Sequence, residues 1–159
     1  DERLVNDGGH VAGSMDFEFV AWSQGTLRHN FVRTNGQSND VSSRPRLRQM
    51  FMAGMIADLE FSLRATASAT QKAEFGVNSA KRSARAAKRL AAAQSKLNQP
   101  LLEDILTVFQ NVELKINNRQ QLTAAADRIN FLGIRFAATV DGEALGAIDE
   151  FIPSESNWK

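Results

Sequence analysis

The chain has 159 residues, 43% of them apolar, and a formal net charge of +1. That length suits one compact domain with a sizeable core, so wholesale disorder is not expected. The absence of cysteine excludes disulfides and thiolate metal sites. No apolar run approaches the roughly 18 residues of a membrane span, and the charged N-terminus, Asp1-Glu2-Arg3, predicts no signal peptide. We therefore expect an intracellular protein, cytoplasmic by default, or a component of an assembled particle.

The small net charge hides an acidic, basic, acidic order along the chain. Residues 28–96 hold 13 Lys/Arg against 4 Asp/Glu, whereas residues 1–27 hold 1 against 5 and residues 97–159 hold 5 against 9. Segment charge predicts partners better than the whole-chain value does. The middle segment is therefore the part expected to contact an anionic partner.

The N-terminal segment alternates apolar and polar residues in two short runs. Residues 16–22 place Phe17, Phe19 and Ala21 on one side, and residues 27–33 place Leu27, His29, Phe31 and Arg33 on one side. The intervening Ser-Gln-Gly-Thr has turn composition. This pattern predicts a short β-hairpin, or failing that an extended arm, over residues 1–43.

A first helix is expected to start near Arg44, with Ser43 as its cap and Pro45 in its first turn. Apolar residues on several sides of residues 47–63 predict burial on more than one face. The run Thr-Ala-Ser-Ala-Thr at 66–70 is a weak point, where the helix either breaks or continues to residue 97.

Three further helices are predicted over residues 71–97, 100–116 and 119–140, and a short one over 143–151. Pro100 starts the third helix, and Asn117-Asn118 separates it from the fourth. Short connections make neighbouring helices antiparallel. The fold class is therefore mainly α: an antiparallel bundle of about four helices over residues 44–152, after a hairpin or arm and before a polar tail at 153–159.

The apolar residues of the fourth predicted helix form a narrow stripe. They are Leu122, Ala125, Ile129, Leu132, Phe136 and Val140. A stripe this narrow is more typical of a coiled-coil seam than of a broad core face. It suggests self-association, and so a homo-oligomer.

The second predicted helix carries a basic face. Its cations fall within about 120° on a wheel of about 100° per residue: Lys81, Arg82, Arg85, Lys88, Arg89 and Lys96. The opposite side is predicted to pack on a neighbour through Ala80, Ala84, Ala87 and Ala91. More positive charge precedes the helix at Arg28, Arg33, Arg44, Arg46 and Arg48.

Three interpretations of this basic face stay open. A continuous positive stripe suits a phosphate backbone, because each neutralised phosphate releases counterions. Acidic segments of neighbouring copies could instead pair with it, or it could be solvated. No acidic residue lies between Lys81 and Lys96, where a merely soluble helix usually carries Glu at i,i+4.

Other chemistry has little support in the sequence. The only histidines, His10 and His29, lie far apart, and no nucleophile elbow or phosphate loop is present. We predict no catalytic residue, no metal site and no cofactor. Trp158, in the polar tail, is either a docking anchor or a side chain folded onto its own core.

The sequence thus predicts a non-enzymatic structural or assembly protein. It would self-associate and use its basic helix face to contact nucleic acid or an acidic neighbouring subunit. A helical sensor or regulatory binding module is the alternative.

Overall fold

A computed structural model describes residues 1–11, 17–26, 28, 31 and 34–159. Two short helices, α1 (Glu2–Asn6) and α2 (Phe19–Ser23), precede the four long ones: α3 (Arg44–Ser68), α4 (Glu74–Leu97), α5 (Pro100–Gln110) and α6 (Arg119–Thr139). The 3₁₀ helices η2 (Gly142–Phe151) and η3 (Glu155–Asn157) follow. The prediction of a mainly helical chain with packed helices is confirmed.

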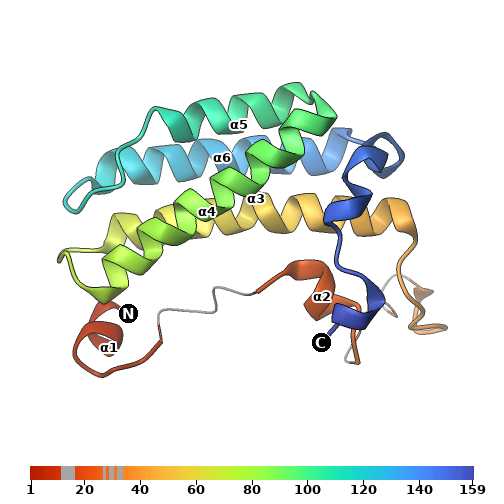
Figure 1. The fold of residues 1–159 in the computed structure, drawn as a ribbon, viewed down its shortest axis with the longest axis horizontal. Helices are drawn as coiled ribbons and strands as arrows, with labels where there is room; N and C mark the ends of the chain where they lie inside the picture. The colour runs from red at the N-terminus through yellow and green to blue at the C-terminus, as the bar shows by residue number, and fades with distance from the viewer. Residues whose placement is uncertain (12–16, 27, 29–30, 32–33) are drawn as a thin grey trace.

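Helix α3 is the centre of the fold. It contacts α4, α6, η2 and α2, and Figure 1 shows α2 on the side of α3 that faces away from α5 and α6. Its central position explains why its sequence is apolar on several sides: Leu47, Phe51, Met52, Ile56 and Leu59 are all buried. The helix ends at Ser68, so the break near residues 66–70 is the alternative that the structure adopts.

Helix α4 packs on α3 mainly through small residues. Its buried positions are Gly76, Ser79, Ser83, Ala86, Ala87, Leu90 and Ala93. Of the alanines predicted to pack, Ala84 and Ala91 are exposed and Ala80 is half-buried. The face of α4 that packs on α3 is therefore rotated from the predicted one. Ser79 and Ser83 are small enough to be buried against α3, but a polar residue is not expected on a packed face from sequence alone.

Helices α4 and α5 are joined by a tight turn that the sequence predicted. Asn98 ends α4 in the left-handed conformation (φ 49°). The Gln99 side chain accepts from the backbone N–H of Leu101, and Pro100 occupies the first turn of α5. Helix α5 ends at Gln110, earlier than predicted, because side chains near the start of α6 donate hydrogen bonds to backbone carbonyls of the α5–α6 connection. Gln121 donates to the Asn111 carbonyl at 3.1 Å, and Asn118 donates to the Glu113 carbonyl at 2.9 Å.

The predicted first strand of the hairpin is wrong, because residues 19–23 form helix α2. Both carboxylate oxygens of Glu18 accept backbone hydrogen bonds, from Val20 at 3.1 Å and from Ala21 at 2.7 Å. This cap satisfies N–H groups in the first turn of α2, which have no partner within the helix. It favours a helix here more strongly than the alternation of apolar and polar residues over 16–22 favours a strand. Leu27, His29 and Arg33, predicted for the second strand, lie outside the described residues.

Both termini pack against the helices. The Glu2 carboxylate accepts from the Thr70 hydroxyl and from the backbone N–H groups of Thr70 and Gln71, and these hydrogen bonds lower its pKa. Asn6 accepts from the backbone N–H of Phe75 at the start of α4. At the other end, Lys159 donates to the Ala21 carbonyl and its own carbonyl accepts from Thr26. A Cβ on Gly25 would lie 1.6 Å from the Lys159 oxygen, so this approach requires glycine. None of the described helices is both long enough and apolar enough to cross a membrane.

Candidate functional site

The cations on the basic face of α4 form two lines along the helix, one next to α3 and η2 and one on the outer side. Arg82, Arg89 and Lys96 lie on the line next to α3 and η2. Arg82 Nε is 2.5 Å from Asp58 Oδ1, and Lys96 Nζ is 2.5 Å from Glu150 Oε1. The Arg89 guanidinium lies 5.8 Å from the centroid of the Phe51 ring. These three cations therefore bind other parts of the same chain.

The remaining cations of the face, Lys81, Arg85 and Lys88, are exposed on the outer side of α4. They form a shorter and narrower positive strip than the sequence suggested. We call these three residues the outer basic strip. No acidic residue follows Glu74 in α4, so the helix itself offers no carboxylate to neutralise the strip.

Two of the arginines that precede α4 hold η2 against the start of α3. Arg48 binds the Asp149 carboxylate in bidentate fashion, with Nε–Oδ1 at 2.7 Å and Nη2–Oδ2 at 2.8 Å. Arg44 Nε lies 3.0 Å from the same Oδ1. Hydrogen bonding by Arg48 and the charges of both arginines lower the pKa of Asp149 to about 2. These arginines have a structural partner rather than an external one.

The carboxylate of Asp149 should make stability depend on pH in the acid range. Its pKa falls from an ordinary 3.8 to about 2 in the folded chain, so its contribution is complete above about pH 4 and is lost as pH falls through 2. We expect Asp149→Asn to melt several degrees below wild type at neutral pH. This difference should shrink between pH 4 and 2. Thermal melts over that range check it, and Asp104→Asn, which removes an exposed carboxylate from α5, is the control for the loss of one negative charge.

Three other predicted contacts are placed as follows. Arg28 donates to the Asn39 and Gln24 carbonyls, Arg46 is half-buried, and Arg33 is outside the described residues. Trp158 packs against the chain's own core, and its indole N–H donates to the Pro153 carbonyl at 3.2 Å. The side chain is thus folded onto its own domain.

An aromatic groove that was not predicted from the sequence lies between α2 and α3. It has a volume of about 460 Å³ and is lined by Phe17, Phe19, Ala53, Gly54, Ala57, Asp58, Phe61 and Arg82. Phe61 is 64% exposed and Phe17 is 44% exposed. Trp22 extends this aromatic surface, because its ring stacks on Phe17 with centroids 6.0 Å apart.

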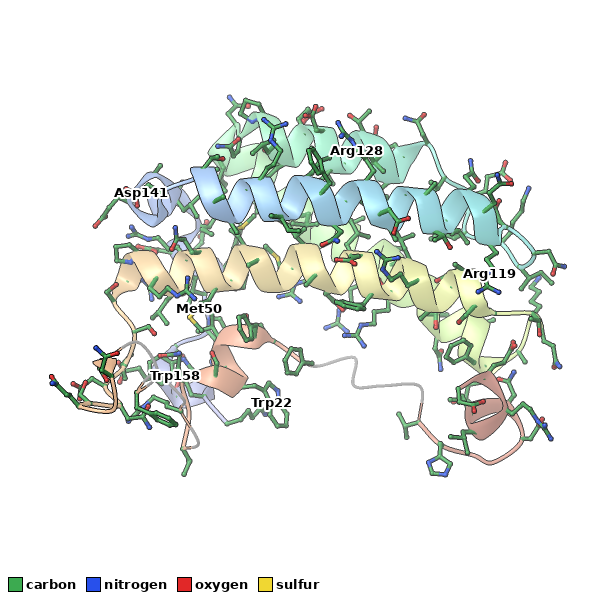
Figure 2. The ribbon with its side chains drawn as sticks, turned by 180° about the vertical axis from the view of Figure 1, so that it is seen from behind. Trp22, Met50, Arg119, Arg128, Asp141 and Trp158 are labelled. Carbon is green, nitrogen blue, oxygen red and sulfur yellow. The ribbon has the colours of Figure 1, made fainter. Side chains whose placement is uncertain are left out.

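Close packing of α2 on α3 shapes the groove. A Cβ on Gly54 would lie 2.7 Å from Phe19 Cβ, so glycine lets the two helices approach. Within α2, the residues Val20 and Ala21 are buried. Gln24, also buried, accepts from the Ser42 N–H at 2.9 Å and fixes the end of α2 near the start of α3. Figure 2 shows Trp22 on α2, with Met50 on the facing part of α3.

A second exposed apolar surface lies on α6. Phe131 is 50% exposed and Ile134 is 63% exposed. The guanidinium groups of Arg128 and Arg135 lie 5.3 Å and 5.9 Å from the Phe131 ring centroid. We call these four residues the α6 patch. The stripe predicted to be an intermolecular seam is not part of it, because Leu122, Ile129 and Leu132 are buried within the chain.

The described residues include no group of three or more His, Asp or Glu side chains arranged to hold a metal ion. Of the six cations predicted to form one basic face, Arg82, Arg89 and Lys96 lie next to α3 and η2, and Lys81, Arg85 and Lys88 form the outer basic strip. Comparison with known proteins finds no matching protein family, no matching curated protein and no matching solved structure.

Proposed function

We propose that the chain is a non-enzymatic assembly protein that self-associates head to tail. In this arrangement the α6 patch of one copy sits in the aromatic groove of the next. The observation that carries the proposal is a pair of exposed apolar surfaces on different elements: the groove of α2 and α3, and the patch of α6. Exposed apolar surface rimmed by polar groups is typical of interaction sites.

The two surfaces have complementary features. The groove is concave, and aromatic anchors in such pockets supply most of the affinity of protein interfaces. The groove lining includes the Asp58–Arg82 ion pair, and Glu18 beside it caps α2, whereas Arg128 and Arg135 flank Phe131 on the patch. Because the surfaces differ, one contact leaves a groove and a patch unoccupied. Repetition therefore gives a ring or a filament.

Light scattering over a range of protein concentrations tests this proposal. Apolar contacts should keep the assembly intact at high salt, while screening shortens the Debye length from about 10 Å at 0.1 M to about 3 Å at 1 M. A monomer at every concentration would contradict self-association. Dissociation by salt alone would favour pairing between the acidic and basic segments instead.

A polyanion contact is the second candidate, and it rests on the outer basic strip. Its three cations lie on one exposed side of α4, so a linear phosphate backbone could follow that side. Arg82, Arg89 and Lys96 lie on the other line of the helix, next to α3 and η2, and are not part of this strip.

If the partner is duplex DNA, Arg85→Gln with Lys88→Gln should flatten the slope of log affinity against log salt by about 2, because each phosphate contact contributes roughly 0.9. Binding should weaken with little regard to base sequence. Fluorescence anisotropy against labelled duplexes measures both effects. Arg119→Gln, which removes an exposed cation from α6, is the control. Absence of DNA binding in the wild type at low salt would eliminate this candidate.

A further inference from the structure

A second cavity lies at the opposite end of the bundle from α2. It is formed where the α3–α4 turn, the first half of α4 and the α5–α6 connection meet, and both connections lie at the same end of the molecule in Figure 1. Its volume is about 410 Å³, and its lining residues are Thr66, Ala69, Lys72, Gly76, Val77, Ala80, Lys81, Leu114, Lys115 and Ile116.

The lining combines an apolar wall with cations. Val77, Ala80, Leu114 and Ile116 supply aliphatic surface from two separate elements, and Ile116 is 36% exposed although it is a large apolar residue. Three lysines line the same cavity. An apolar interior with a few polar groups is the usual composition of a small-molecule site, and such sites occupy roughly 300–1,000 Å³.

The lysines give the cavity an excess of positive charge. Lys115 forms an ion pair with Glu113. The side chains of Lys72 and Lys81 make no hydrogen bond or ion pair within the part of the chain that the structure describes. Among the residues described there, the lining includes no Asp or Glu. The nearby Glu2 carboxylate already accepts hydrogen bonds from Thr70 and Gln71.

We propose that this cavity binds an anionic single-chain amphiphile, with its apolar chain against Val77, Leu114 and Ile116 and its head between Lys72 and Lys81. Burial of the chain supplies most of the affinity. The lysines select an anionic head over a neutral or cationic one. This site uses different residues from the aromatic groove and the α6 patch, so it is independent of the proposed assembly.

Isothermal titration calorimetry with four probes of one chain length tests the proposal: decanoate, decyl phosphate, decanol and decylammonium, each below its micelle concentration. Both anions should bind more tightly than decanol, and decylammonium should bind most weakly. The stronger of the two anions identifies the preferred head, carboxylate or phosphate. Equal affinity for decanol and the anions, or no binding by either anion, would overturn the proposal.

Variants place the binding in this cavity. Lys72→Gln and Lys81→Gln should each weaken anion binding up to roughly fivefold, as expected for an exposed charge pair, and leave decanol unchanged. Ala80→Phe fills the cavity and should abolish binding of all the probes while the chain keeps its cooperative melt. Lys88→Gln, on the same helix but outside the cavity, should bind like wild type. If Lys88→Gln weakens anion binding as much as Lys81→Gln does, the charge effect is general and the proposed site is wrong.

Discussion

Phe136→Ala should destabilise the chain by about 3–5 kcal/mol, the usual range for a buried Phe. The Phe136 side chain is 1% exposed and is the largest of the fully buried side chains in the described residues, so its removal leaves a cavity in the core. Leu122, Ile129 and Leu132 of the same helix are fully buried and cannot shift far to fill that space. Denaturation by urea measures the change as a lower midpoint at an unchanged slope.

Phe131→Ala is the matched control, because it removes the same side chain from the same helix on the exposed side. It loses only partial burial and the contacts with Arg128 and Arg135, so we expect a change below about 1 kcal/mol. Equal losses of unfolding free energy in the two variants would show that the side of α6 carrying Phe136 is not the buried one. Phe109 on α5 is half-buried, so the loss of stability in Phe109→Ala should fall between the losses in the other two variants.

The helices that the sequence predicts best are those whose ends are fixed locally. Pro45 and Pro100 lie in the first turns of α3 and α5, and Asn98 ends α4. The stripe of α6 runs through a single helix, so its period is visible without any knowledge of the neighbours. What the stripe contacts is not visible in this way, and it packs inside the chain rather than between chains.

The basic face of α4 shows why charge pairing is harder to predict. Its own helix lacks acidic residues at i,i+4, and this absence suggested unpaired cations. The partners come from other elements: Asp58 lies 24 residues from Arg82, and Glu150 belongs to η2. Only the crossing of α4 over α3 and the return of η2 bring these groups together.

The aromatic groove depends on a similar long-range contact. Phe17 and Phe19 look like one side of a strand, and Phe61 lies on a helix that is buried on several other sides. The groove exists because Glu18 caps α2 and Gly54 lets Phe19 approach α3. One signal was available in the sequence: Phe61 lies off the main apolar arc of its helix, and such a residue needs a second neighbour or a partner.

Head-to-tail assembly should fail when either of its two surfaces is changed. Phe61→Gln alters the groove, and Ile134→Gln alters the α6 patch; both side chains are more than half exposed, so the fold should survive. If each is an anchor of the interface, its loss should weaken association roughly 30-fold or more, equivalent to about 2 kcal/mol. Val11→Gln, which changes an exposed apolar residue outside both surfaces, should assemble like wild type.

Mixing the two variants separates this geometry from a symmetric one. Each variant alone should assemble only at much higher concentration than wild type, since every contact needs one intact groove and one intact patch. In a mixture, the intact patch of the Phe61→Gln chain can enter the intact groove of the Ile134→Gln chain, but no further copy can add. Light scattering should therefore show heterodimers and nothing larger. If groove instead met groove, Ile134→Gln would assemble like wild type and mixing would rescue nothing, which would exclude the head-to-tail arrangement.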